Sequence, residues 1–481
     1  MNVPRVLHAG AASRDVTPSL DLPSLGGTPR LRRPRRVLDA LKARALVLDD
    51  GRTAVALVSI DAIGFSDVVL EAAESVSEEA TKRARRASGL ARVEVVLTAT
   101  HAHTTPETVG IAPTASVPAL SAWLDTLLDV VADVVSEAAR SRRAVTLTRA
   151  VTSLGGVSVN RRHRTADGRV LRPFELDAEA VVLDHGPLDE RVVVWGFDGI
   201  ERDERVATLV GFACHPTLLQ GHAVVSADFP GVATAQLDRR LGGVALFLQG
   251  ASGDVGPRDG PADMVAAQSL GVALAERAER ALPFPRTLSP RVHDESSDAP
   301  PASPRLAFAR AHADLPIRTD APSPDRGPCP VTSDLTTDSP TNVGELASTW
   351  TAAWYAAEAR RLEVLSERHP TLRTEVCAMR VDDAYLLALP GEPFVALGNA
   401  LRSSLPDHAA MIVGCTGSYV GYLAPGTEFE RGGYEVAYGA WNRLGRDGAE
   451  AVVGLARKVV EHVTWVSSAH ATRPAKGPCR A

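Results

Sequence analysis

Short apolar runs rich in β-branched residues alternate along this chain with longer stretches in which apolar residues recur at helical spacing. Runs with the length and composition of strands lie at residues 43–50, 53–61, 93–101, 207–215, 244–252, 384–392 and 409–417. Stretches with helical periodicity lie at residues 68–88, 117–140, 231–241, 263–282, 343–368, 393–405 and 449–466. This alternation predicts an α/β fold with a central β-sheet covered by helices.

The composition changes between residues 283 and 341, where Pro, Ser, Asp and Arg are frequent. Within this segment only residues 305–318 alternate regularly enough to form a strand, and we interpret the flanks as flexible linkers. No internal repeat or coiled-coil heptad is visible in the sequence. We therefore predict a single domain over residues 1–466, interrupted by this partly flexible insertion and followed by a polar tail at residues 467–481.

The 481 residues carry a formal net charge of −6, and acidic and basic residues are interleaved along the chain. We therefore expect no basic surface of the kind that binds a nucleic-acid backbone. One short basic cluster, residues 30–36, fits a solvated loop, and a contact with an anion or a partner is the alternative.

The first residues, MNVPRVLHAG, lack the apolar core and cleavage site of a secretion signal, and no apolar run reaches the roughly 18 residues that a membrane span needs. The cysteines show no CxxC spacing, which fits reduced thiols better than disulfides or a thiolate metal site. They are Cys214, Cys329, Cys377, Cys415 and Cys479. We expect a cytoplasmic protein without a membrane span.

Several of the apolar runs end at residues that are costly to bury and capable of chemistry. These residues are His101, His103, His215, Asp254, Glu392, Tyr419 and Tyr422. In open α/β sheets, ligand sites gather just outside the carboxyl ends of the strands. We therefore expect these side chains to converge on one site.

His101 and His103 are two residues apart on a segment that we expect to be extended, so both imidazoles would point to one face. One could then bind a metal while the other serves as a base. For each taken alone, an ordinary hydrogen-bonded histidine is the alternative, and His215 by itself fits a buried core histidine. Three histidines, Glu392 and a tyrosine at separate strand ends together favour a zinc site with an open position, because imidazole and carboxylate are its usual ligands.

The sequence around these residues resembles the motifs of one family. ATHAHTTP at residues 99–106 is similar to the ATHTHSGP-type motif of the neutral/alkaline ceramidases, and ACHPT at residues 213–217 is similar to their second histidine motif, THPT. Further likenesses are HAGAASRDVTP, VSVNRRH, GASGDVGP, LPGEPF and GYLAPGTEFERGGYE, which follow the family's order over about residues 8 to 440. The resemblance implies a ceramidase-like catalytic domain.

Carried over by position, the resemblance implies one zinc ion per chain, held by His101, His215, Glu392 and Tyr422. Tyr422 is chosen over Tyr419 because the family's other functional tyrosine lies twelve positions after the ligand, where this chain has Tyr434. Zinc would lower the pKa of a bound water so that it can attack the scissile carbonyl.

The resemblance also implies roles for residues that do not bind the metal. His103 would act as the general base and pass a proton to the leaving nitrogen, and Tyr434 would donate a hydrogen bond to the developing oxyanion. Arg161, Asp254 and Gly256 would lie against the substrate. A surface ion pair is the alternative for Arg161.

The chain departs from the family at Gly256, where ceramidases carry a serine in the motif GDVSP. A serine nucleophile at this position is excluded, whereas attack by zinc-bound water is unaffected. We also expect no C-terminal immunoglobulin-like domain of the kind that the ceramidases carry. These departures favour a small soluble amide over a membrane sphingolipid as the substrate.

We therefore predict a zinc-dependent hydrolase that cleaves an amide bond, N-acyl or a related C–N bond, in a small soluble molecule. An ester or lactone hydrolase or a lyase with the same zinc site is one alternative. A noncatalytic metal-binding or carbohydrate-binding scaffold is another, and the presence of His103 and Tyr434 argues against it. The oligomeric state is not encoded in any pattern that we recognise.

Overall fold

The computed structural model describes residues 6–22, 34–67, 75–110, 118–176, 178–202, 204–258, 260, 262–282, 305–320, 352–407 and 409–471. The largest element is an eight-stranded sheet. Its strands, in spatial order, are β14 (Val244–Gln249), β12 (Arg205–Phe212), β11 (Arg191–Gly199), β6 (Arg143–Ser153), β1 (His8–Asp15), β3 (Lys42–Asp49), β4 (Ala54–Ile60) and β5 (Val93–Ala99). A mixed sheet of this size is the centre of the α/β fold that the sequence predicts.

The sheet consists of two halves that join through a short pairing. Strands β1, β3, β4 and β5 form one half and β6, β11, β12 and β14 the other, and β1 meets β6 only at His8↔Ala144 and Ala9↔Arg143. Ser59 Oγ on β4 donates to the carbonyl oxygen of Phe247 on β14 at 2.6 Å. This bond joins the two halves a second time, so the sheet curls rather than extending flat.

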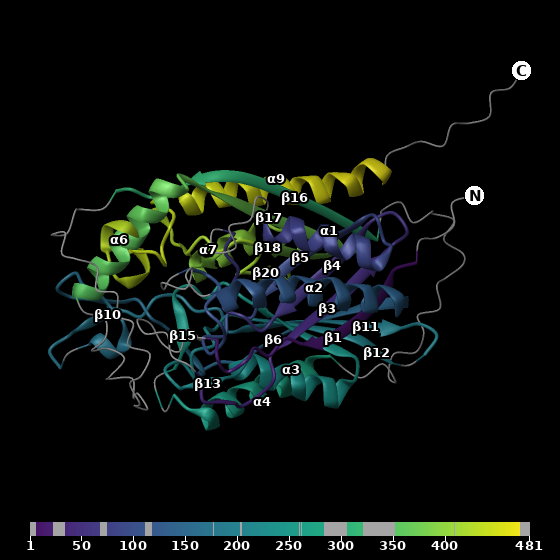
Figure 1. Ribbon diagram of the computed structural model, residues 1–481, viewed down its shortest axis with the longest axis horizontal. Helices are drawn as coiled ribbons and strands as arrows, with labels where there is room; N and C mark the ends of the chain where they lie inside the picture. The colour runs from purple at the N-terminus through teal and green to yellow at the C-terminus, as the bar shows by residue number, and fades with distance from the viewer. Residues whose placement is uncertain are drawn as a thin grey trace, which may run out of the picture.

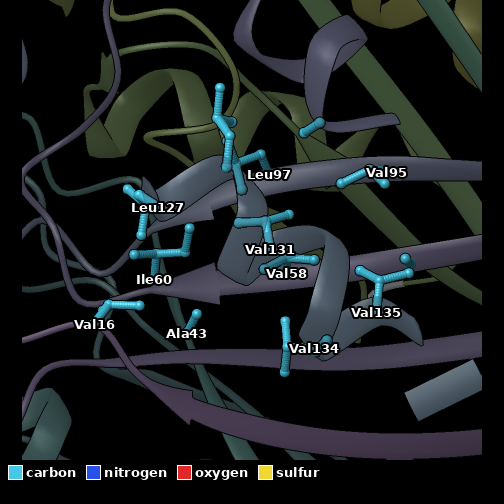
Figure 2. Close-up of a cluster of buried hydrophobic side chains, with 14 of the residues drawn as sticks. Val16, Ala43, Val58, Ile60, Val95, Leu97, Leu127, Val131, Val134 and Val135 are labelled. Atoms are coloured by element: carbon cyan, nitrogen blue, oxygen red, sulfur yellow. The ribbon is translucent and has the colours of Figure 1, made fainter. Parts of the chain in front are cut away.

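Helices cover one face of each half. Helices α1 (Val76–Ser88) and α2 (Pro118–Arg140) pack on the first half, and α3 (Asp228–Leu241) and α4 (Met264–Ala281) on the second. Figure 2 shows the core under α2, where side chains of the helix meet those of the strands. Its labelled residues are Val16, Ala43, Val58, Ile60, Val95, Leu97, Leu127, Val131, Val134 and Val135. Leu127, Val131 and Val135 are four residues apart, so one apolar stripe of α2 lies on the sheet.

A second sheet packs on the other face of both halves. It contains β16 (Leu306–Pro316), β17 (Thr371–Val381), β18 (Ala384–Ala388) and β20 (Met411–Val413). A shared core joins the two sheets, with Leu46 and Trp195 from the first and Met379 from the second. Because β16 lies within residues 305–318, the strand that we expect inside the insertion is confirmed.

Further helices close the outer face of the second sheet. Helix α9 (Gly448–Ala471) contacts β16 and β17 and runs along β16 in Figure 1, on the side of the molecule opposite α3 and α4. Helices α7 (Val395–Ser403) and α6 (Ala352–Arg368) belong to the same core, through Leu397, Leu401 and Leu362. The helices therefore enclose both sheets.

Every strand that the apolar runs predict is present, and every predicted helix has a counterpart. The first residues of three expected helices, 68–74, 117 and 343–351, lie outside the described part of the chain. Helix α9 continues through Ala471 into the expected polar tail, and the rest of that tail lies outside the description as well. Most of the flanks of β16 that we expect to be linkers, residues 283–304 and 321–341, likewise lie outside the described part of the chain.

Three long strands were not expected: β6, β11 and β17. Strands β11 and β17 are buried at nearly every position. Arg373, Glu375 and Arg380 interrupt the apolar run of β17, whereas β11 has an apolar run at residues 192–197 like those of the expected strands. Strand β6 carries charged residues and is only partly buried. Among the described helices, none is long and apolar enough to cross a membrane.

Candidate metal centre

The strands that carry the candidate residues belong to parallel pairs. Strand β4 runs parallel to β5, β12 to β14, and β18 to β20. Parallel neighbours end at the same edge of a sheet, so the segments that follow them meet in space. His101 and His103 follow β5, His215 follows β12, and Glu392 follows β18.

The turn after β5 differs from the expectation of an extended segment. His101 has a left-handed backbone with φ +67°, and its N–H donates to the carbonyl oxygen of Ala62 at 2.9 Å. Such a conformation costs a non-glycine residue on the order of 1–3 kcal/mol and persists where the surrounding structure fixes it. The expected alternation was therefore wrong, but the imidazoles of His101 and His103 still meet, with ring centroids 4.9 Å apart.

Three imidazoles and one carboxylate form a tight group, which we call the metal cluster: His101, His103, His215 and Glu392. The Nε2 atom of His101 lies 3.2 Å from Nε2 of His215 and 3.4 Å from Nε2 of His103. Oε2 of Glu392 lies 3.0 Å from Nε2 of His215 and 3.4 Å from Nε2 of His101. The ligand atoms of the three histidines are all within 4.8 Å of one another, the spacing of a group that can hold a metal ion.

Backbone carbonyls fix the tautomers of the two buried histidines. His101 Nδ1 is 2.6 Å from the carbonyl oxygen of Ile63, and His215 Nδ1 is 2.8 Å from that of Ser252 and 3.0 Å from that of Val255. A carbonyl oxygen only accepts hydrogen bonds, so each Nδ1 carries the hydrogen and each Nε2 presents a lone pair when the ring is neutral.

These lone pairs make the cluster a good fit for a cation. Two neutral Nε2 atoms face each other and the Glu392 carboxylate with no hydrogen between them, an arrangement that is repulsive without a positive charge. The carbonyl partners on Nδ1 are also the support that metal-bound histidines usually have. Imidazole nitrogen and carboxylate oxygen suit zinc.

The directions of the pKa shifts in the metal cluster also favour a positive charge at its centre. Burial alone would lower the pKa of His101, but the neighbouring Cys415 and Glu392 side chains raise it well above its usual range. Burial would raise the pKa of Glu392, yet His101 and His215 hold it well below the usual range. Both directions favour a positive charge between the imidazoles and the carboxylate, which a bound metal ion would supply.

Two tyrosines lie beside Glu392, one of them on the neighbouring strand. The short strands β19 (Glu392–Pro393) and β21 (Tyr422–Leu423) run parallel, with Glu392 opposite Tyr422. The hydroxyl of Tyr419 donates to Glu392 Oε1 at 2.7 Å, and the hydroxyl of Tyr422 accepts from Arg161 Nη2 at 3.2 Å. Both tyrosines are therefore at the site, and the assignment of Tyr422 as a ligand stays a prediction.

Two solved structures are similar to this chain throughout. A neutral ceramidase from Pseudomonas aeruginosa matches with a TM-score of 0.64 and 15% identity, covering 100% of this chain and 77% of the other. A ceramidase complexed with C2 matches with the same TM-score and 16% identity, covering 99% of this chain and 77% of the other. The chain has the fold of the neutral ceramidases. No protein-family model and no curated protein matches the sequence.

In this ceramidase-like fold, Tyr434 lies in a stack beside the metal cluster. Its ring is parallel to that of Trp441, with centroids 5.2 Å apart, and the guanidinium of Arg172 lies 4.5 Å from its centroid. The ring of Tyr422 is 6.1 Å away. Burial raises the pKa of Tyr434, so its hydroxyl keeps its hydrogen and can donate it.

Arg161 lies among internal partners rather than in a surface ion pair. Besides Tyr422, its Nη2 donates to the carbonyl oxygen of Gly253 and lies 3.4 Å from Glu435. Arg162 donates to the same Glu435 at 3.0 Å and to Glu428 at 2.9 Å. We call Arg161, Arg162, Glu428 and Glu435 the arginine cluster.

The other two expected substrate contacts have framework positions. The Asp254 carboxylate is buried and accepts hydrogen bonds from Asn160 Nδ2 and from the N–H of Val395 at the start of α7, both at 2.8 Å. A Cβ atom at Gly256 would lie 3.3 Å from Cδ of Arg161, so the glycine makes room for that side chain. Direct contact of either residue with substrate stays a prediction.

Two residues that the structure places beside these candidates were not expected there: Arg172 and Glu435. Glu435 directly follows Tyr434, and this adjacency was the only signal available for it. Tyr419 was expected at the site because it follows an apolar run, but without a role of its own. Arg172 reaches Tyr434 from a distant part of the chain, and nothing local marks it.

Proposed function

We propose that this protein is a zinc-dependent hydrolase that cleaves an amide bond, N-acyl or a related C–N bond, of a small soluble substrate. The observation that carries the proposal is the convergence of His101 Nε2, His215 Nε2 and Glu392 Oε2 within 3.0–3.4 Å of one another. The neutral-ceramidase fold, together with the ordered motifs, supports an amide as the bond cleaved.

One zinc ion per chain would be held by His101, His215, Glu392 and Tyr422, in line with the motif resemblance. When bound, zinc supplies two effects: it lowers the pKa of a water toward neutrality and it polarises a carbonyl group. The protein contributes the fixed orientation of each donor atom. That orientation comes from the carbonyl oxygens of Ile63, Ser252 and Val255 on the two imidazoles.

His103 is the proposed base. Its Nδ1 is buried and has no hydrogen-bond partner among the described residues, whereas Nδ1 of both other histidines is bonded to a carbonyl. Burial, followed by the charges of His101 and His215, lowers the pKa of His103 well below its usual range. As a neutral imidazole of the metal cluster that does not bind the ion, His103 would accept a proton from the attacking water and return it to the leaving nitrogen.

Tyr434 and Arg161 are proposed to act on the substrate. Tyr434, fixed between Trp441 and Arg172, would donate its hydroxyl hydrogen to the oxygen on which negative charge develops. Arg161 combines a donor to Tyr422 with a buried Nε that has no partner in the described structure. A guanidinium at this place would bind a hydroxyl or carboxylate of the substrate.

The metal content of the purified protein, measured by mass spectrometry, tests the proposal, and we expect about one zinc per chain. Activity is then measured on N-acyl p-nitroanilides of varied acyl length and on the p-nitrophenyl esters of the same acids. Anilide cleavage that stops on chelation and returns with zinc supports the proposal. Cleavage of esters alone would favour the ester hydrolase, and a protein that takes up no added zinc would overturn the metal site.

A further inference from the structure

Tyr419 holds the oxygen of Glu392 that faces away from the histidines. Its hydroxyl donates to Oε1 at 2.7 Å, while Oε2 of the same carboxylate faces His101 and His215. The residue is 3% exposed, so water does not compete for this bond. The two oxygens of the Glu392 carboxylate thus have different partners: the Tyr419 hydroxyl on one side and the two histidines on the other.

The position of Tyr419 is itself fixed on several sides. Its N–H donates to the carbonyl oxygen of Phe65 at 2.5 Å, and its carbonyl oxygen accepts from Arg443 Nη1 at 3.0 Å. The guanidinium of Arg443 also lies 5.2 Å from the centroid of the Tyr419 ring. Arg443 is 1% exposed and bonds to Ser66 Oγ at 3.0 Å. The hydroxyl of Tyr419 therefore approaches Glu392 from a rigid support.

We propose that Tyr419 is a positioning residue for Glu392, a role that rests on the proposed metal site. A glutamate side chain has several rotatable bonds, and freezing them costs free energy each time the carboxylate binds. The bond to Oε1 holds the carboxylate in place before any ion arrives, so Oε2 faces the imidazoles in advance. Tyr419 and Tyr422 then have different roles: Tyr419 orients the metal ligand Glu392, and Tyr422 lies beside Arg161.

Tyr419→Phe tests this role because it removes one hydroxyl and keeps the ring in the core. Removing such a partner of a metal ligand typically weakens metal binding about 10- to 100-fold, and we expect a loss of zinc affinity in this range. The zinc dissociation constant is measured by competition with a chromogenic chelator on the full chain. The rate at which zinc is released to excess chelator is measured as well, and we expect it to be higher for Tyr419→Phe than for the wild type.

Tyr385→Phe is the matched control. Tyr385 is also buried, at 7% exposure, and its hydroxyl lies 3.4 Å from Thr464 Oγ1 in the core of the second sheet, apart from the metal cluster. We expect its zinc affinity to equal that of the wild type. The melting temperatures of the two variants without metal are compared with that of the metal-free wild type. A decrease seen in both variants reports the loss of a buried hydroxyl and not the loss of a metal-site contact.

The outcomes separate this inference from the proposed function. Weaker zinc binding in Tyr419→Phe with unchanged binding in Tyr385→Phe supports the positioning role. Equal zinc affinity of Tyr419→Phe and wild type would overturn the role and leave the metal site standing. A wild-type protein that binds no zinc would overturn the metal site and this role with it.

Discussion

The metal cluster and the arginine cluster lie next to each other and differ in how their charges are satisfied. In the arginine cluster, Arg162 has a carboxylate from both Glu435 and Glu428, and Arg161 has Glu435. In the metal cluster, His101 and His215 present lone pairs to each other and to Glu392. The charges of the arginine cluster are paired within the protein, although Nε of Arg161 has no partner among the described residues, whereas the lone pairs of the metal cluster face one another and fit a cation.

The largest expected effect separates the two clusters directly. Glu392→Ala removes a donor of the metal cluster, and we expect zinc content to fall from about one ion per chain to near zero, with loss of turnover. Glu428→Ala removes a carboxylate of the arginine cluster and should leave zinc content unchanged. The zinc content of both purified variants is measured. Equal loss of zinc in the two variants would contradict the proposal that the metal cluster, and not the arginine cluster, binds the ion.

His103→Ala distinguishes a base from a metal ligand within the metal cluster. We expect turnover to fall by about 10²- to 10⁴-fold, the usual contribution of a general base, while zinc content stays near one per chain. The exposed His462 on α9 offers the control, since His462→Ala should retain turnover. If His103→Ala lost its zinc, His103 would be a ligand, which its place among three clustered histidines allows.

Tyr434→Phe tests the stack that borders both clusters. The ring would keep its contact with Trp441, so we expect retained zinc and a fall in turnover equivalent to about 2.7–4 kcal/mol, the cost of losing one oxyanion donor. Steady-state kinetics on the best anilide substrate gives this value. Turnover close to that of the wild type would remove Tyr434 from the mechanism.

Gly256→Ser has the smallest expected effect and acts on the arginine cluster. The new Cβ would lie 3.3 Å from Cδ of Arg161, so the arginine side chain, which bonds to Gly253 and Tyr422, must move slightly to make room. We expect KM to rise on the order of 10-fold with zinc retained, a change of the size that small steric differences cause. An unchanged KM would show that the substrate does not sense this displacement of Arg161.

Much of the fold could be predicted from local pattern. The apolar runs gave the strands that carry the site, such as β5 and β12, because a buried strand needs apolar residues whatever its neighbours are. The same reasoning failed for β17, where Arg373, Glu375 and Arg380 interrupt the apolar run although the strand is largely buried. Strand β11 has an apolar run at residues 192–197 like those of the expected strands, and the prediction omitted it. The expected extended backbone at His101 also failed, because contacts with Ala62 and Ile63 impose a left-handed conformation.

The order of apolar runs and polar residues along the chain is enough to tell which chemical groups follow the strands, and these groups include the four residues of the metal cluster. Which atoms face each other depends on tertiary packing: Nε2 of His101 meets Nε2 of His215, and Tyr419 donates to Glu392. The first contact joins residues that are more than a hundred positions apart in the sequence. The second contact joins the Tyr419 hydroxyl to one particular oxygen of the Glu392 carboxylate. Local propensity acts over a few residues, so such pairings are set by how the sheets and helices pack.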